Sequence, residues 1–200
     1  MNTLIKFYSK KMIFFLTFIL CTQGAIPELN ASPGSTYQTI EDFEVEQKID
    51  QLLLLIQKRL VIMHEVARTK WNQNLPIEDK IREEQILADL AELARQYDLD
   101  EKWITNFFQA QIDASKVIQK NDFAFWQKEG VLKFKEVFSL KNELRSYIDH
   151  LNHEMMILFS KINVKNFNVN KFILDKPIST RYSDYIESDV WLLAILPLKN

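Results

Sequence analysis

The sequence is poor in the residues that build tightly turned or cross-linked folds. Its 200 residues include one cysteine, three glycines and five prolines. Sandwiches, barrels and doubly wound sheets with phosphate-binding loops need more glycine and proline in their turns, and an internal disulfide needs a second cysteine. Intrinsic disorder is excluded as well, because 47% of the residues are hydrophobic and 12% are aromatic. We therefore expect a folded, mostly helical protein.

The first 25 residues have the composition of a secretory signal peptide. A basic start is followed by a nine-residue apolar run at 12–20 and by small or polar residues up to Ala25. The basic residues are Lys6, Lys10 and Lys11. Nine apolar residues are too few to cross a bilayer, which takes about 20, so a retained anchor is the less favoured alternative. We predict that the protein is exported and is periplasmic or secreted.

Removal of this segment leaves a mildly acidic chain. The sequence has 25 basic and 27 acidic residues; residues 1–25 hold three of the basic ones and no acid, which leaves 22 against 27, a net charge of −5. This charge balance lacks the excess of basic residues with which proteins bind nucleic acid or anionic lipid. We therefore predict no nucleic-acid partner and no membrane association after cleavage of the signal.

Beyond a leader at 26–38, helical periodicity dominates the chain. Apolar residues recur at three- and four-residue steps over about 39–74, 79–97, 101–126, 131–162 and 183–196. Breaks fall at Leu75-Pro76, at Asp98-Leu99-Asp100 and at Gly130. We predict a single all-α domain at 39–200, with a pocket-bearing half at 39–126 and a C-terminal helical half at 131–200.

Two cations lie where an amphipathic helix does not need them. Arg59 and Lys70 are eleven residues apart, which places them within about 20° of one another around a helix, and the apolar Val66 shares their face. A charge on an apolar face is costly unless it is paired. Taken alone, the pattern also fits side chains that extend to the surface or pair with Glu65 or Glu78.

Further polar residues follow at two predicted helices. Asp79, Arg82 and Glu83 lie at the start of the second helix, just after the Leu-Pro-Ile-Glu turn. On the third helix Ser115 and Gln119 are four residues apart and therefore share a face. Without context Ser115 and Gln119 would be ordinary polar residues of the surface.

Together these segments resemble the chorismate mutases of the all-helical AroQ class, over residues 50–126. The matching motifs, in chain order, are Leu-Leu-Ile-Gln-Lys-Arg59-Leu, Val-Ala-Arg-Thr-Lys70-Trp, Leu-Pro-Ile-Glu-Asp79, Ile-Arg82-Glu83 and Phe-Phe-Gln-Ala-Gln-Ile-Asp-Ala-Ser115-Lys-Val-Ile-Gln119. The export signal and the additional C-terminal half are similar to the secreted gamma subclass in particular.

The resemblance implies an all-helical enzyme that rearranges chorismate to prephenate without a cofactor or a metal, and it implies a homodimer. The implied substrate, chorismate, is a small dicarboxylate. In the secreted subclass an arginine from the second half of the same chain completes the site, and Arg145-Ser-Tyr-Ile-Asp-His-Leu-Asn152 is similar to that segment. The residues alone leave another interpretation open, in which Arg145 is a surface partner of Glu143 or Asp149.

By resemblance, the site residues have separate roles. Arg59, Arg82 and Arg145 would bind the two carboxylates, with help from Ser115. Lys70 and Gln119 would flank the ether oxygen. Asp79 and Glu83 would take the ring hydroxyl. The predicted catalytic set is therefore Arg59, Lys70, Arg82, Gln119 and Arg145, and Asp79, Glu83 and Ser115 complete the substrate-binding set.

Two other functions remain as alternatives. An isochorismate pyruvate-lyase uses a similar small helical pocket, although the size of this chain and its export signal argue against it. A secreted helical interaction protein could keep such a fold and lack catalysis. The spacing of His150, His153 and Glu154 could serve a metal, with His64 as a further ligand, but no fuller ligand motif is present, so we predict no metal site.

Overall fold

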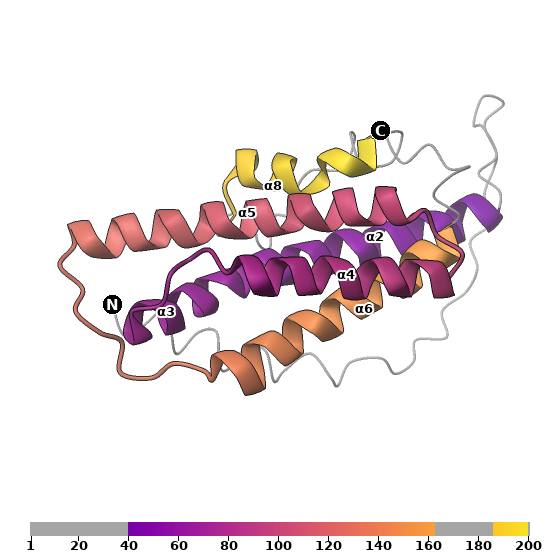
Figure 1. Cartoon of the computed structure of the whole chain (residues 1–200). Helices are drawn as coiled ribbons and strands as arrows, with labels where there is room; N and C mark the ends of the chain where they lie inside the picture. The colour runs from indigo at the N-terminus through magenta and orange to yellow at the C-terminus, as the bar shows by residue number, and fades with distance from the viewer. Residues whose placement is uncertain (1–39, 163–185, 200) are drawn as a thin grey trace, which may run out of the picture. The chain divides into compact units, whose positions relative to one another are not determined.

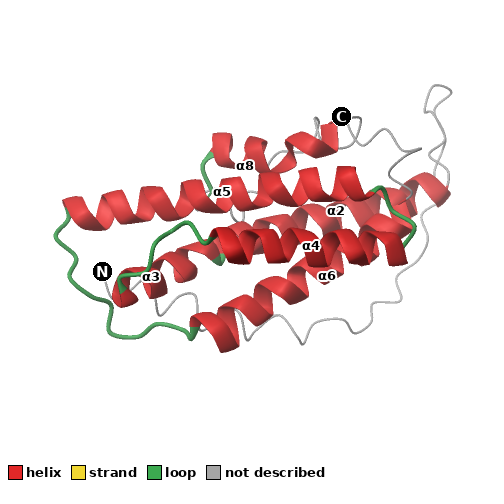
Figure 2. Cartoon of the chain, viewed as in Figure 1, coloured by secondary structure: helices red, strands yellow, loops and turns green. Residues whose placement is uncertain are grey.

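The computed structural model describes residues 40–162 and 186–199, and all the regular structure in these ranges is helical (Figures 1 and 2). The elements are α2 (Ile40–Val61), α3 (Met63–Gln73), α4 (Lys80–Gln96), α5 (Glu101–Lys128), the π-helical turn η2 (Leu140–Leu144), α6 (Arg145–Ile162), α8 (Ser188–Ile195) and the 3-10 turn η4 (Leu196–Lys199). The described residues belong to one compact unit, Gln38–Asn200. The predicted all-α class is confirmed, whereas the predicted signal peptide and leader lie outside the described residues.

The long first helix is confirmed with one interruption. Ile62 separates α2 from α3 but keeps right-handed helical angles, φ −66° and ψ −16°. Hydrogen bonds from the Ile62 N–H to the Lys58 carbonyl and from the Val66 N–H to the Ile62 carbonyl, both 3.1 Å long, carry the helical pattern across it. Arg59 and Lys70 therefore remain on one nearly continuous helical path, as their spacing predicts.

Aspartates begin the next two helices. Asp79 is the N-cap of α4, where its carboxylate accepts a hydrogen bond from the Arg82 N–H at 3.2 Å. Asp100 caps α5 through the Trp103 N–H at 2.8 Å. An N-cap carboxylate satisfies a backbone donor that the helix leaves unpaired. The predicted starts of both helices are confirmed to within a residue.

The prediction of one helix over 131–162 is wrong for its first nine residues. Gly130 ends α5 with a φ of +66°, a left-handed conformation that favours glycine, and the chain is irregular until η2 begins at Leu140. Side chains of α3 bind the backbone of this loop instead. Asn72 donates to the Phe134 carbonyl at 2.9 Å and accepts from the Phe134 N–H at 2.8 Å, and Thr69 donates to the Phe138 carbonyl at 3.0 Å.

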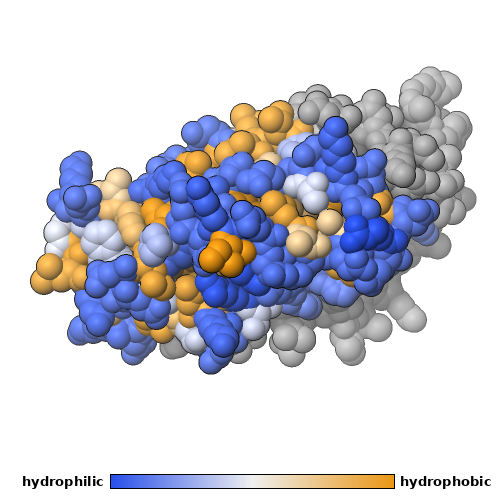
Figure 3. Space-filling model, in the orientation of Figure 1, coloured by the Kyte–Doolittle hydropathy of each residue, from blue (hydrophilic) through white to orange (hydrophobic). Residues whose placement is uncertain are grey.

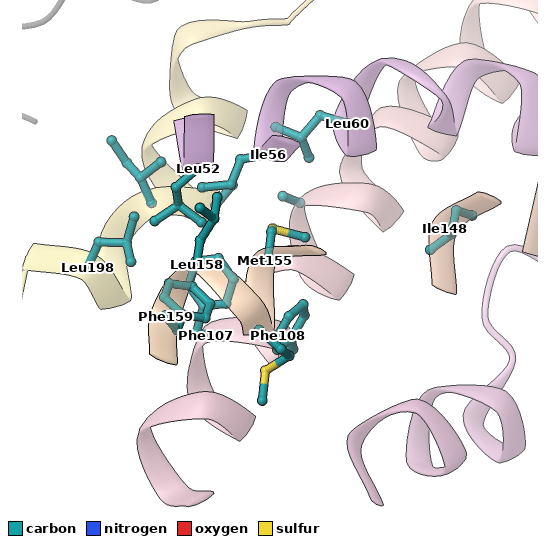
Figure 4. Close-up of a cluster of buried hydrophobic side chains, with 14 of the residues drawn as sticks. Leu52, Ile56, Leu60, Phe107, Phe108, Ile148, Met155, Leu158, Phe159 and Leu198 are labelled. Carbon is teal, nitrogen blue, oxygen red and sulfur yellow. The ribbon is translucent and has the colours of Figure 1, made fainter. Parts of the chain in front are cut away.

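The hydrophobic core joins α2, α5, α6 and the C-terminal segment (Figure 4). Phe107 is fully buried in it, with ring centroids 5.0 Å from Phe108 and 4.9 Å from Phe159 in edge-to-face geometry. Figure 4 also shows Leu52 and Ile56 of α2 directed toward this aromatic group and Leu198 closing it from η4. Tight packing of this kind fixes the relative positions of the helices, and so also those of the polar residues that they carry.

The C-terminal helix docks on the core. In Figure 1 α8 lies along α5, on the side away from α4 and α6. Its buried residues are Val190, Trp191, Ala194 and Ile195. Leu192 of α8 and Leu196 of η4 remain exposed, and Figure 3 shows apolar atoms on the surface along this edge of the molecule. In the described part of the chain, no helix is both long enough and apolar enough to span a membrane.

Candidate active site

The residues predicted to form the site belong to separate hydrogen-bonded groups, which charge interactions link into one network. Arg59 of α2 bonds to Ser115 of α5, and Gln119 bonds back to the Ser115 carbonyl. Arg145 of α6 pairs with Asp79 at the start of α4. Residues far apart in the chain therefore meet where α2, α3 and α5 approach the first turns of α4 and α6.

Arg59 is buried and is held by neutral groups. It is 2% exposed. Its Nε donates to Oδ1 of Asn152 at 3.0 Å, and its Nη1 donates to the Gln111 carbonyl at 2.9 Å and to Oγ of Ser115 at 2.8 Å. The interpretation that this side chain extends to the surface or pairs with Glu65 or Glu78 is therefore wrong.

These bonds leave one end of the guanidinium available. An arginine has five N–H donors, and those on Nε and Nη1 of Arg59 are engaged; among the described residues nothing accepts from Nη2. Burial lowers the pKa of Arg59 to about 10, against an opposing effect of the Asp149 charge. The group is therefore still a cation at neutral pH, with Nη2 as its unused donor.

Lys70 is the second buried cation. It is 8% exposed, and its Nζ donates to the Ile77 carbonyl at 2.5 Å. Burial lowers the pKa of Lys70 below that of an ordinary lysine, and repulsion from Arg145 lowers it further. The negative charges of Asp79 and Glu83 act in the opposite direction, Asp79 more strongly. A pairing with Glu65 or Glu78 is wrong here too, because those carboxylates pair with Arg68 and Lys120.

The other two arginines are each paired with a carboxylate. Nη2 of Arg82 lies 2.7 Å from both carboxylate oxygens of Asp149. Nη2 of Arg145 lies 2.8 Å from Oδ2 of Asp79. The alternative partners considered for Arg145 from the sequence, Glu143 and Asp149, are therefore not its partners. Both pairs are partly exposed, so water or a ligand can compete for them.

Asp79 and Glu83 also stabilise the start of α4. Oε1 of Glu83 accepts from the Asp79 N–H at 3.2 Å, and its Oε2 lies 3.0 Å from Nζ of Lys116. Asp79 caps the helix with one oxygen and binds Arg145 with the other. The two carboxylates hold the turn after α3 in place, next to Lys70.

Ser115 and Gln119 lie on the buried face of α5. Oγ of Ser115 donates to the Gln111 carbonyl at 2.6 Å while it accepts from Arg59. Nε2 of Gln119 donates to the Ser115 carbonyl at 3.0 Å. In the described part of the chain, Oε1 of Gln119 and Nε of Arg82 are buried without a hydrogen-bond partner. Unpaired buried polar atoms are costly, and a polar ligand that bonded to these two atoms would remove that cost.

Sequence reasoning missed two residues of this network, Asp149 and Asn152. They follow Arg145 at four and seven residues, so the three share one face of α6. Each contacts a different residue of the site, namely Asp79, Arg82 and Arg59. Other polar residues lie on the same helix, among them His150, His153 and Glu154, so the spacing alone did not single out Asp149 and Asn152.

The histidines considered as metal ligands lie elsewhere. Nδ1 of His64 lies 2.7 Å from Oδ2 of Asp122, which joins α3 to α5, and the His153 ring lies 6.4 Å from that of Tyr97. Within residues 40–162 and 186–199, no group of three or more histidine, cysteine or acidic side chains is arranged to hold a metal ion.

Comparison with known proteins gives a consistent result. Residues 47–120 match the family described as chorismate mutase type II. The sequence is 36% identical over 109 residues to a secreted chorismate mutase of Mycobacterium tuberculosis, with 54% of each chain covered. It is 32% identical over 81 residues to a chorismate mutase of Methanocaldococcus jannaschii, which covers 38% of this chain and 82% of that one.

Solved structures agree in fold. The crystal structure of chorismate mutase from Burkholderia thailandensis superimposes with a TM-score of 0.66 at 25% identity, over 76% of this chain and 99% of that chain. The chain spans about half the length of the first two curated relatives, 54% and 43%. It covers most of the Methanocaldococcus protein, however, at an identity that establishes common descent. The chain therefore belongs to the chorismate mutase type II family.

Proposed function

We propose that the protein is a chorismate mutase, which rearranges chorismate to prephenate within one molecule. The observation that carries this proposal is the pair of buried cations, Arg59 and Lys70, whose hydrogen bonds within the described residues all go to neutral acceptors. A buried charge without a bonded counter-ion is costly. A ligand with two carboxylates would supply the missing negative charge, and chorismate is such a ligand.

The reaction needs little beyond a shaped, charged site. In this rearrangement the ether C–O bond breaks while a C–C bond forms between the enolpyruvyl arm and the ring, with no proton, electron or group exchanged with the protein. The substrate must be held compactly, with its arm over the ring. Binding then supplies the entropic cost of reaching this conformation before the reaction begins. Negative charge grows on the ether oxygen and is stabilised by donors that are already in place.

The contacts of the buried residues support specific roles. Nη2 of Arg59 is free to bind a carboxylate, since its other donors are engaged. Lys70 uses one of its three N–H donors on Ile77, which leaves two for the ether oxygen. Gln119 has a second amide N–H beyond the one bound to Ser115, and it would donate to the same oxygen.

The paired residues would act by exchanging partners. Arg82 and Arg145 would release Asp149 and Asp79 in part and bind the substrate carboxylates, because a guanidinium fork matches a carboxylate well. Asp79 would then be available for the ring hydroxyl. Glu83, with both oxygens already engaged, would accept that hydroxyl through a remaining lone pair, and Ser115 would support the carboxylate on Arg59.

The test is prephenate formation by the purified chain without its first 25 residues. Chorismate should disappear at a rate proportional to enzyme, with stoichiometric prephenate. Lys70→Ala should lose most of the activity while circular dichroism shows the parental helix content. Release of pyruvate from isochorismate, with no prephenate from chorismate, would favour the lyase alternative. A helical, inactive protein with both substrates would favour an interaction protein.

We further propose that the protein is exported to the periplasm and acts as a homodimer. Export is supported by the signal-like segment at 1–25 and by relatives named secreted chorismate mutases. Cell fractionation with an epitope at the C-terminus would give a shortened protein in the periplasmic fraction. Light scattering on the purified chain would give twice the monomer mass if it dimerises, and the monomer mass would contradict this part.

A further inference from the structure

The second half of the chain presents one polar face to the site. Arg145, Asp149 and Asn152 lie on consecutive turns of α6, within about 60° of one another. Arg145 and Asp149 make partly exposed ion pairs. Asn152 differs from both, because it is 3% exposed and its partner Arg59 is equally buried.

We propose that Asn152 is a positioning residue for the reaction. It holds Nε of Arg59 with a neutral acceptor, which fixes the guanidinium plane and leaves both its positive charge and its Nη2 to the substrate carboxylate. This inference rests on the proposed chorismate mutase activity, because the carboxylate is that of the substrate.

The geometry restricts what Arg59 does. Asn152 fixes Nε from α6, and the Gln111 carbonyl and Ser115 fix Nη1 from α5. A guanidinium held on two edges by two helices keeps one orientation. Its remaining donors are those of Nη2, so Arg59 makes a one-ended contact with a carboxylate instead of a two-pronged one.

The neutrality of the amide is the second part of the inference. An aspartate at position 152 would keep an acceptor oxygen near the present 3.0 Å and would make a buried ion pair with Arg59. That pair would cancel the charge that a dianionic substrate needs. An apolar residue would keep the charge but leave the Nε donor unpaired, and the guanidinium would lose its fixed plane. Asparagine meets both demands.

The decisive variant is Asn152→Asp. We expect the KM for chorismate to rise about tenfold or more, a factor that equals in free energy a shift of about one pKa unit. The melting temperature should stay at or above that of the parent. His153→Asp is the matched control, because it adds the same charge one residue along α6 on an exposed side chain; its KM should stay within about twofold. Parental kinetics in Asn152→Asp would overturn the inference.

A spectroscopic readout tests the hydrogen bond without activity. The Nε–H resonance of Arg59, assigned by its loss in Arg59→Lys, should be protected from exchange in the parent and in Asn152→Asp, and should lose protection in Asn152→Ala. Equal protection in the parent and in Asn152→Ala would contradict the contact. If the parent makes no prephenate, the proposed function is wrong. If the parent is active and the Asn152 variants have parental kinetics, only this inference is wrong.

Discussion

Asp149 holds Arg82 through both carboxylate oxygens, each 2.7 Å from the same Nη2 atom. The pair joins α6 to the first turn of α4, and the Asp149 charge also raises the pKa of Arg59 against the effect of burial. In the proposed reaction Arg82 binds a substrate carboxylate. Asp149 is therefore an internal carboxylate that the substrate has to displace.

Asp149→Asn should consequently strengthen substrate binding. The amide keeps the shape but removes one negative charge from the site of a dianion, so we expect KM to fall about threefold at low ionic strength. The free energy of unfolding should drop by less than about 1 kcal/mol, since the pair is partly exposed. Steady-state kinetics and urea unfolding measure both. A higher KM with a lower kcat would show instead that Asp149 orients Arg82 for catalysis.

Lys70→Ala should reduce kcat/KM by about 100- to 1000-fold, comparable to the loss of one oxyanion donor. Its Nζ is the donor that lies next to the turn formed by Ile77 and Asp79. Most of the loss should fall on kcat, because charge on the ether oxygen develops only in the transition state. A loss confined to KM would assign Lys70 to ground-state binding.

The lowered pKa of Lys70 predicts opposite trends in activity and stability at alkaline pH. In the folded protein Lys70 loses its proton at a lower pH than a free lysine, whose pKa is 10.5. Activity should therefore fall as the pH rises toward 10.5, because the neutral amine no longer carries the positive charge. Over the same interval the unfolded chain binds more protons, so this group makes the free energy of unfolding rise with pH. Comparing unfolding at several alkaline pH values in the parent and in Lys70→Ala isolates that slope. A steeper rise in the variant would contradict the assignment.

The helices that local signals mark were predictable. Asp79 and Asp100 precede apolar periodic segments, and each caps a helix at the expected place. The path of 131–139 was not predictable, because its apolar residues fit a helical period while its backbone partners, Thr69 and Asn72, lie more than 60 residues earlier in the chain. Gly130 marked only the end of α5.

The site residues also divide into those that local patterns indicated and those that depend on distant contacts. Position on a helix face indicated that Arg59 and Lys70 lie together, and a family resemblance added Arg82, Gln119 and Arg145. Asn152 could not be found that way, since it is 93 residues from Arg59 and only the packing of α6 on α2 brings them together. Whether a cation is paired also depends on such packing, so the neutral environment of Arg59 had no counterpart in the sequence.

Asn72→Ala should destabilise the fold by about 2 kcal/mol, because it removes two hydrogen bonds that hold Phe134 and leaves both backbone groups in need of partners. Asn72→Asp keeps only the acceptor and should lie between the parent and Asn72→Ala. Asn121→Ala, which removes an exposed bond to Glu187, is the control and should change the free energy by less than about 0.5 kcal/mol. Urea unfolding ranks the three variants, and an unaffected Asn72→Ala would mean that the loop does not depend on this contact.

Gln119→Glu should convert a flat pH profile into a steep one. The Gln119 amide donates at any pH, so kcat/KM of the parent should stay level from mildly acidic to mildly alkaline conditions. A glutamate donates to the ether oxygen only when protonated, and its carboxylate would repel the growing negative charge there. The variant should therefore approach parental activity only in acid and lose it as pH rises past the pKa of the new carboxyl. The same flat profile in both proteins would remove position 119 from the reacting atoms, and a steep fall in the parent across neutrality would assign the essential proton to another acid.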